Sequence, residues 1–193
     1  MKKSLAGMEV AILVGNGFSE ADMIATQRAL MDVKAKMKVV SVDQGLVNGM
    51  NETGWGHNFA VDKPLNEALA ADFDMLVIPG GDASSKKLMT TAHAKRFVGG
   101  FMMAHKPVAA FNDGVMMVMN TGDIDGLEMT GPESMKEMME EAGAMYMADQ
   151  NMVQSVNVIT GGMMDRDAFV KSMIEFFSSY DMEEDEEEMA QAA

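Results

Sequence analysis

The sequence predicts an α/β fold, a three-layer sandwich in which helices cover both faces of a mostly parallel sheet. Short apolar runs alternate along the chain with longer segments that have the spacing of amphipathic helices. Such alternation is typical of parallel strands that are buried on both faces. The chain has 193 residues, 48% of them hydrophobic, which suits one domain with a sizeable core. Because there is no internal repeat or linker, residues 1–180 are expected to form a single domain.

Each predicted strand is a short apolar run that ends at glycine, proline or a polar residue. The predicted strands are 10–14, 39–42, 73–78, 107–111 and 153–160. The segments between them have apolar residues at helical spacing, and the predicted helices are 20–36, 83–89, 91–104, a methionine-rich segment after 114, 132–142 and 165–178. Residues 43–62 are rich in glycine and asparagine and are expected to form a loop or a small hairpin.

The formal charge of the chain is −15, and residues 181–188 contribute seven acidic side chains and no basic one. A run of like charges usually stays solvated, so residues 181–193 are expected to be a disordered acidic tail. Binding of cations or of a basic partner by this tail is the alternative. Nucleic acid is not expected as a partner, because phosphate binding requires an excess of Lys and Arg.

Membrane, metal and dinucleotide sites are not expected. No apolar run approaches the ~20 residues of a membrane span, and the N-terminus lacks the apolar stretch of a signal peptide, so a cytoplasmic location is expected. The Gly15-Asn16-Gly17 loop departs from a dinucleotide fingerprint, because Glu20 stands at the third glycine position and would repel a pyrophosphate. The histidines are not spaced like metal ligands, so no metal or cofactor is expected at His57, His93 or His105.

Cysteine is absent from the chain, whereas methionine occurs 25 times. The absence of cysteine excludes disulfides, thiolate metal sites and catalysis by a cysteine nucleophile. Because only 6% of the residues are aromatic, methionine is expected to fill core or interface volume. Two alternatives stay open. Thioethers could bind copper(I), and exposed methionines could consume oxidants by reversible conversion to the sulfoxide.

Any ligand is expected at three loops that follow predicted strands, because ligands of such sheets lie beyond the carboxyl ends of the strands. These loops are 15–22, 79–82 and 111–114. They bring together a polar trio of Asp22, Asn112 and Asp113. Two carboxylates in one site push one pKa upward, which can supply acid–base chemistry, and the amide could orient a small polar ligand. Alternatively, Asn112 only satisfies Asp22 and the nearby backbone.

Six segments follow one another in a family-specific order from about residue 10 to residue 177. They are VAILVGNGF at 10–18, VDKPL at 61–65, FDMLVIPGG at 73–81, KPVAAF at 106–111, EAGA at 141–144, and IT at 159–160 with AF at 168–169. In their order and spacing these segments resemble the ThiJ/PfpI superfamily. The resemblance implies a flavodoxin-like fold of the class I glutamine amidotransferase type.

The resemblance also implies where a site would lie. Enzymes of this superfamily carry a cysteine at a sharp turn between a strand and a helix, where backbone N–H groups and the helix dipole lower its pKa. This chain has Asn112 at the cysteine position, Asp113 at the neighbouring histidine position and Gly114 at the glycine of the turn. Asp22, five residues after Gly17, stands where the superfamily usually has glutamate.

Two glycine pairs complete the comparison. Gly80 and Gly81 match the glycines whose N–H groups stabilise an oxyanion. Gly161 and Gly162 replace the Ser-Arg that often follows the last strand. An asparagine amide does not ionise and is a poor nucleophile. The protease, glyoxalase and deglycase activities of the superfamily are therefore not expected here.

We expect a catalytically silent member of the superfamily that is stress-related or binds a small polar ligand. The expected ligand contacts are Asp22, Gly80, Gly81, Asn112, Asp113 and Gly114. One alternative is a hydrolase or lyase that uses Asp22 and Asp113 as acid and base around Asn112, without a thiol intermediate. Another is an assembly module. The resemblance further implies a homodimer or a larger homo-oligomer.

Overall fold

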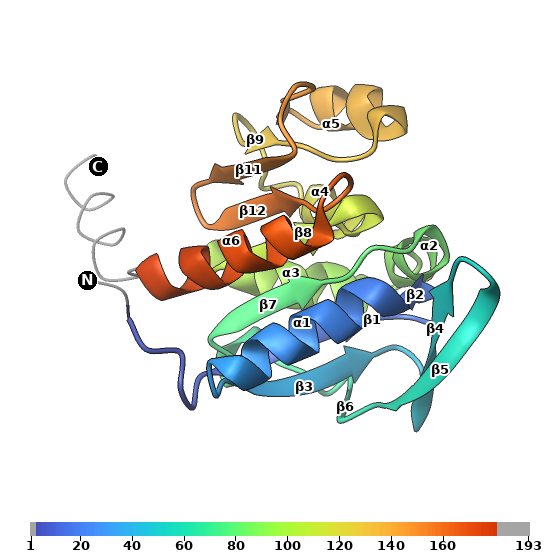
Figure 1. Cartoon of the computed structure of the whole chain (residues 1–193). Helices are drawn as coiled ribbons and strands as arrows, with labels where there is room; N and C mark the ends of the chain where they lie inside the picture. The colour runs from blue at the N-terminus through green and yellow to red at the C-terminus, as the bar shows by residue number, and fades with distance from the viewer. Residues whose placement is uncertain (1–2, 181–193) are drawn as a thin grey trace.

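The computed structural model describes residues 3–180 as one central sheet between two layers of helices (Figure 1). This arrangement confirms the predicted α/β fold with its mostly parallel sheet. No helix among residues 3–180 has the length and the apolar character that crossing a bilayer would need. The segment 181–193, predicted to be an acidic tail, lies outside the described residues.

The central sheet has seven strands in the order β11-β12-β8-β7-β1-β3-β6, and neighbouring strands are parallel except for β11 and β12. The strands are β1 (Glu9–Val14), β3 (Lys36–Ser41), β6 (Lys63–Pro64), β7 (Met75–Ile78), β8 (Val108–Phe111), β11 (Met152–Ser155) and β12 (Val158–Gly161). The adjacent strands β1, β7 and β8 are almost entirely buried, because they are apolar on both faces. Because these neighbouring strands are also parallel, their carboxyl ends meet at one edge of the sheet.

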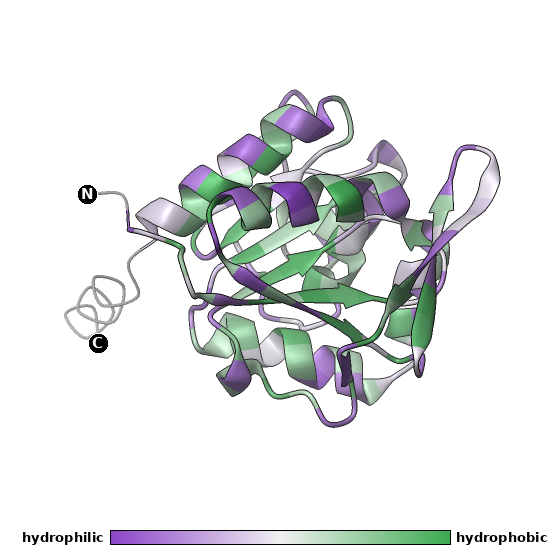
Figure 2. Cartoon of the chain, turned by 60° about the horizontal axis from the view of Figure 1, so that its bottom comes forward, coloured by the Kyte–Doolittle hydropathy of each residue, from purple (hydrophilic) through white to green (hydrophobic). Residues whose placement is uncertain are grey.

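Two helix layers enclose the sheet and create a separate core on each face (Figure 1). The helices α1 (Glu20–Asp32) and α6 (Arg166–Ser179) cover one face, and α2 (Asp82–Met89), α3 (Ala92–Met103) and α4 (Val115–Met119) cover the other. Figure 2 shows the hydrophobic strands in the middle layer, with hydrophilic residues on the outer sides of the helices.

Methionines fill much of the core beside α3 and α4, as expected from their number. The buried ones on this side of the sheet are Met102, Met116, Met117, Met119, Met129, Met135 and Met139. Other methionines face solvent, and Met103 and Met164 are 79% and 78% exposed. The chain therefore uses methionine both as core filling and as exposed thioether.

A second, three-stranded sheet stands beside the carboxyl ends of the central strands. It consists of β2 (Phe18–Ser19), β4 (Leu46–Asn51) and β5 (Gly54–Ala60). Strands β4 and β5 form an antiparallel hairpin, which is the projecting ribbon on the right of Figure 1. The segment predicted as a loop or hairpin at 43–62 is thus a hairpin. The remaining elements are β9 (Glu128–Met129), β10 (Met145–Tyr146), α5 (Lys136–Glu141) and the 3-10 turns η1 (Ala70–Asp72), η2 (Asn112–Gly114) and η3 (Glu133–Met135).

Two predicted elements differ from the structure. The single strand predicted at 153–160 is the antiparallel pair β11–β12, which turns at Val156 with a φ of 49°. A β-branched residue rarely adopts this left-handed conformation, so the composition gave no sign of a turn. The helix predicted at 20–36 ends at Asp32, because Lys34 is left-handed, with a φ of 58°, and starts the passage into β3.

Candidate functional site

The three predicted loops come together at the carboxyl ends of β1, β7 and β8. The backbone N–H of Ser19 donates to the carbonyl oxygen of Gly80 at 2.6 Å, which joins the first loop to the second. A Cβ atom at Gly80 would lie 3.0 Å from Asn112 Cβ and 3.0 Å from Asp22 Oδ2. Loops that are far apart in the sequence therefore place Asp22 and Asn112, two members of the predicted trio, beside one glycine.

Asn112 occupies a strained turn between β8 and α4. Its φ is 44°, in the left-handed region that asparagine tolerates better than most residues. The side chain is half-buried, and no group within residues 3–180 forms a hydrogen bond with its amide. Strained backbone of this kind is concentrated at functional sites. The alternative in which Asn112 satisfies Asp22 is not seen, because no hydrogen bond joins the two side chains within residues 3–180, so the amide is free to contact a ligand.

Asp22 is fully buried, and each of its carboxylate oxygens has a partner. Oδ1 accepts a hydrogen bond from Arg166 Nε at 2.6 Å, and Oδ2 accepts one from the Gly80 N–H at 3.0 Å. The backbone N–H of Asp22 donates to Ser19 Oγ, which caps α1. Asp22 thus fastens three elements together: the start of α1, the Gly80 loop and the start of α6.

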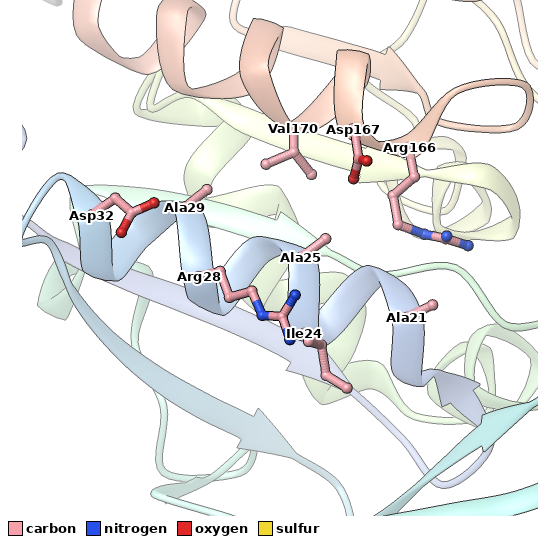
Figure 3. A pocket seen from close by; sticks show the side chains of 9 residues that line it. All are labelled: Ala21, Ile24, Ala25, Arg28, Ala29, Asp32, Arg166, Asp167 and Val170. Atoms are coloured by element: carbon pink, nitrogen blue, oxygen red, sulfur yellow. The ribbon is translucent and has the colours of Figure 1, made fainter.

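Arg166 is the functional residue that sequence reasoning missed. It is the first residue of α6 and lies beside a groove of about 460 Å³ between α6 and α1. Figure 3 shows Arg166 at this groove, with Ala21 and Ala25 of α1 facing α6. The one sequence signal was its position, because Arg166 is the first basic residue after Gly161-Gly162, which stand where the superfamily often has Ser-Arg.

Asp113 points its carboxylate at the second glycine of the same loop. The Gly81 N–H donates to Asp113 Oδ2 at 3.4 Å, and Asp113 is half-buried. The N–H groups of Gly80 and Gly81, which match the oxyanion glycines of the superfamily, are therefore both directed at carboxylates of the protein itself. An oxyanion that developed on a substrate would have to displace these carboxylates and would be repelled by them.

A pocket of about 550 Å³ opens beside Asn112. It is lined by Gly17, Ser19, Met50, Gly81, Asp82, Ala83, Asn112, Asp113, Pro132 and Met163. Three of the predicted contact residues line it, namely Gly81, Asn112 and Asp113. The other three predicted contacts, Asp22, Gly80 and Gly114, are buried and do not line it. Within the described part of the chain, the lining contains no Lys, Arg or His, so its charged groups are carboxylates.

The histidines lie apart from this pocket. His57 pairs with Glu20 on the hairpin side of α1, and neither His93 nor His105 belongs to the pocket lining. Among residues 3–180, no three His, Asp or Glu side chains are grouped closely enough to hold a metal ion. The groups that the pocket offers to a ligand are therefore the Asn112 amide, the carboxylates of Asp82 and Asp113, and apolar side chains.

Comparison with known proteins gives the family. The profile of the DJ-1/PfpI family matches residues 8–176, which is most of the chain. The chain belongs to the DJ-1/PfpI family. Among DJ-1/PfpI relatives, the "putative cysteine protease YraA" of Bacillus subtilis is 31% identical over 79% of this chain and 87% of its own. "General stress protein 18" of the same organism is 29% identical over 72% of this chain and 78% of its own.

Solved structures of DJ-1/PfpI proteins have the same fold. The DJ-1beta protein of Drosophila melanogaster superposes with a TM-score of 0.78 at 20% identity, covering 93% of this chain and 95% of that one. A two-domain protein of Anabaena variabilis, with DJ-1/ThiJ/PfpI-like and ferritin-like domains, has a TM-score of 0.78 at 26% identity. The match covers 86% of this chain and 47% of that two-domain chain.

Proposed function

We propose that this chain is a DJ-1/PfpI protein without thiol chemistry, which binds a small polar ligand non-covalently in the pocket beside Asn112. The observation that carries the proposal is the free amide of Asn112, held on a strained turn in the lining of a pocket of about 550 Å³. In this reading Asn112 stands at the position of the family nucleophile. The amide offers a donor and an acceptor to a ligand, but it does not form a covalent intermediate.

The hydrogen bonds of the Gly80 and Gly81 N–H groups support the absence of catalytic activity. Acyl transfer and carbonyl chemistry need free donors where negative charge develops. Here the Gly80 N–H is bonded to Asp22 and the Gly81 N–H to Asp113. The alternative of a hydrolase or lyase is less well supported, because Asp22 is 0% exposed and has both oxygens engaged.

The charge of the lining favours neutral or cationic ligands over anions. Asp82 and Asp113 line the pocket, and Asp82 is paired with Lys86 at 2.8 Å. Asp113 is therefore the lining carboxylate that forms no ion pair with a basic side chain of residues 3–180. Met50, Pro132 and Met163 supply apolar wall, which suits a ligand with a short apolar portion.

Ligand-observed saturation-transfer NMR tests binding directly, with acetamide, ethylammonium and acetate as probes. We expect transfer to acetamide and ethylammonium, weak or absent transfer to acetate, and loss of all transfer in Asn112→Leu. Equal transfer to acetate, or an unchanged signal in Asn112→Leu, would contradict the proposal. A panel of peptide, ester and methylglyoxal substrates tests silence, and turnover that is lost in Asn112→Ala would overturn it.

The biological context is also part of the proposal. Two relatives of similar identity bear the names of a general stress protein and a putative cysteine protease. Since the chain has no cysteine, it cannot act as a cysteine protease. We therefore propose a stress-related role, as the name of the other relative indicates. We also infer a homodimer or a larger homo-oligomer from the family resemblance, and measurement of the molar mass in solution tests this.

A further inference from the structure

A buried carboxylate outside the pocket fastens the β4–β5 hairpin to the start of α1. The side chain of Glu20, the first residue of α1, is only 7% exposed. Its Oε1 accepts a hydrogen bond from His57 Nδ1 at 2.6 Å, and its Oε2 accepts one from the His57 backbone N–H at 2.8 Å. The hydrogen bonds from the His57 side chain and backbone hold the pKa of Glu20 below its ordinary value, although burial opposes them.

The hairpin is shaped around this carboxylate. A Cβ atom at Gly56 on β5 would lie 1.6 Å from Glu20 Oε2, and one at Gly49 on β4 would lie 2.9 Å from Glu20 Cβ. Both strands thus require glycine where they pass the carboxylate. The pairing register of β4 with β5 also shifts next to Gly49. We call Glu20, His57, Gly49 and Gly56 the Glu20 clasp.

The strand that the clasp holds also forms a wall of the Asn112 pocket. Met50 follows Gly49 on β4 and lines the pocket. Ser19 pairs with Met50 and lines it as well. A register shift re-aims the side chains that follow it, and such shifts are common beside active sites. Glu20 does not line the pocket, so any effect on the pocket acts through Met50 and its strand.

We propose that Glu20 is a positioning residue, which keeps the hairpin wall closed beside Asn112 and thereby limits the size of the molecules that enter the pocket. The inference rests on the proposed function, because it assigns the wall of that same pocket. It makes a different prediction, however, since access to Asn112 can be measured without any ligand.

Because the chain has no cysteine, a cysteine introduced at position 112 is its only thiol, and the access of reagents to that position can be measured. Asn112→Cys introduces a single thiol, whose alkylation is followed by intact-mass spectrometry. The rates for iodoacetamide and for the bulkier fluorescein maleimide are compared with and without Glu20→Ala. Loss of the clasp hydrogen bonds should raise the maleimide rate roughly five- to tenfold, and the iodoacetamide rate much less. Glu20→Gln keeps an acceptor for the His57 N–H and should show a smaller increase.

Two controls separate positioning from general destabilisation. Glu52→Gln removes an exposed charge at the tip of the same hairpin and should leave both rates unchanged. Ala109→Cys places a thiol in the buried strand β8, and Glu20→Ala should not accelerate its alkylation. Equal acceleration at both positions, or a maleimide-to-iodoacetamide ratio that Glu20→Ala does not change, would overturn the inference. Failure of the NMR probes to bind, with this ratio changed as expected, would count against the proposed function alone.

Discussion

The ion pair between Arg166 and Asp22 should be a major source of stability at the site, and Arg166→Ala tests this. Asp22 is 0% exposed, so the substitution leaves a buried carboxylate with only the Gly80 N–H as a partner. Breaking a buried pair costs about 3–5 kcal/mol, and losing a hydrogen bond to a charged group costs about 1.5–3 kcal/mol. Because the Arg166 side chain is 40% exposed, solvent weakens the pair and the lower part of these ranges applies.

We therefore expect Arg166→Ala to lower the free energy of unfolding by about 2–3 kcal/mol. For a chain of this length, that corresponds to a fall in Tm of about 4–12 °C. Urea unfolding followed by circular dichroism measures the change. Arg28→Ala, at an exposed arginine of the same groove, is the matched control and should change stability by less than about 0.5 kcal/mol.

A double-mutant cycle with Asp22→Asn isolates the pair. Asparagine keeps an acceptor for the Gly80 N–H and removes the buried charge, so Arg166→Ala should cost much less in that background. Equal costs of Arg166→Ala in both backgrounds, or a loss no larger than that of Arg28→Ala, would refute the reasoning.

Three further predictions follow from the same geometry. Asp113→Ala should free the Gly81 N–H. In NMR spectra, acetate should then shift the amide resonance of Gly81 in the variant only. An equal shift in the unaltered protein would show that Asp113 does not block the donor. Because the pKa of Glu20 is lowered in the folded protein, the clasp stabilises the hairpin above the ordinary carboxyl value of 4.5 and is lost as the pH falls through the lower folded value. The emission of Trp55 on β5 should therefore change in acid below pH 4.5 and not in Glu20→Gln, and a step at neutral pH would contradict this assignment. Peroxide should oxidise the exposed methionines first and spare the fully buried ones, as read by peptide mass spectrometry, and oxidation without regard to exposure would count against an oxidant sink on the surface. The exposed ones include Met31, Met103 and Met164, and the fully buried ones include Met23, Met117, Met129, Met139 and Met173.

The sequence was sufficient for the parallel strands β1, β3, β7 and β8 and for the meeting of the three loops, but not for the edge strands β6 and β11. Each loop follows a buried parallel strand, and in such a sheet the carboxyl ends of adjacent strands lie together. Asp22, Gly80 and Asn112 could therefore be placed side by side from their positions after β1, β7 and β8. The complete burial of Asp22, which keeps it out of the pocket lining, could not be predicted, because it depends on how α1 packs.

The partners of the two buried carboxylates could not be predicted. Arg166 and Asp22 are 144 residues apart, and their contact depends on the reach of one long side chain from the start of α6. Glu20 and His57 meet only because a bulge and two glycines let the hairpin approach α1. Hydrophobic periodicity predicts which face of a helix or strand is buried. It does not predict which side chains of two different elements come into contact, and both of these pairs depend on such contacts.

The position of Asn112 is tested most directly by the ionisation of a thiol placed there. In Asn112→Cys combined with Asp113→His, the alkylation rate by iodoacetamide is measured against pH. If Asn112 occupies the nucleophile turn at the start of a helix, the thiol should form one adduct and ionise below its ordinary pKa of about 8.5. A thiol that resists alkylation, or that ionises at or above this value, would contradict the account.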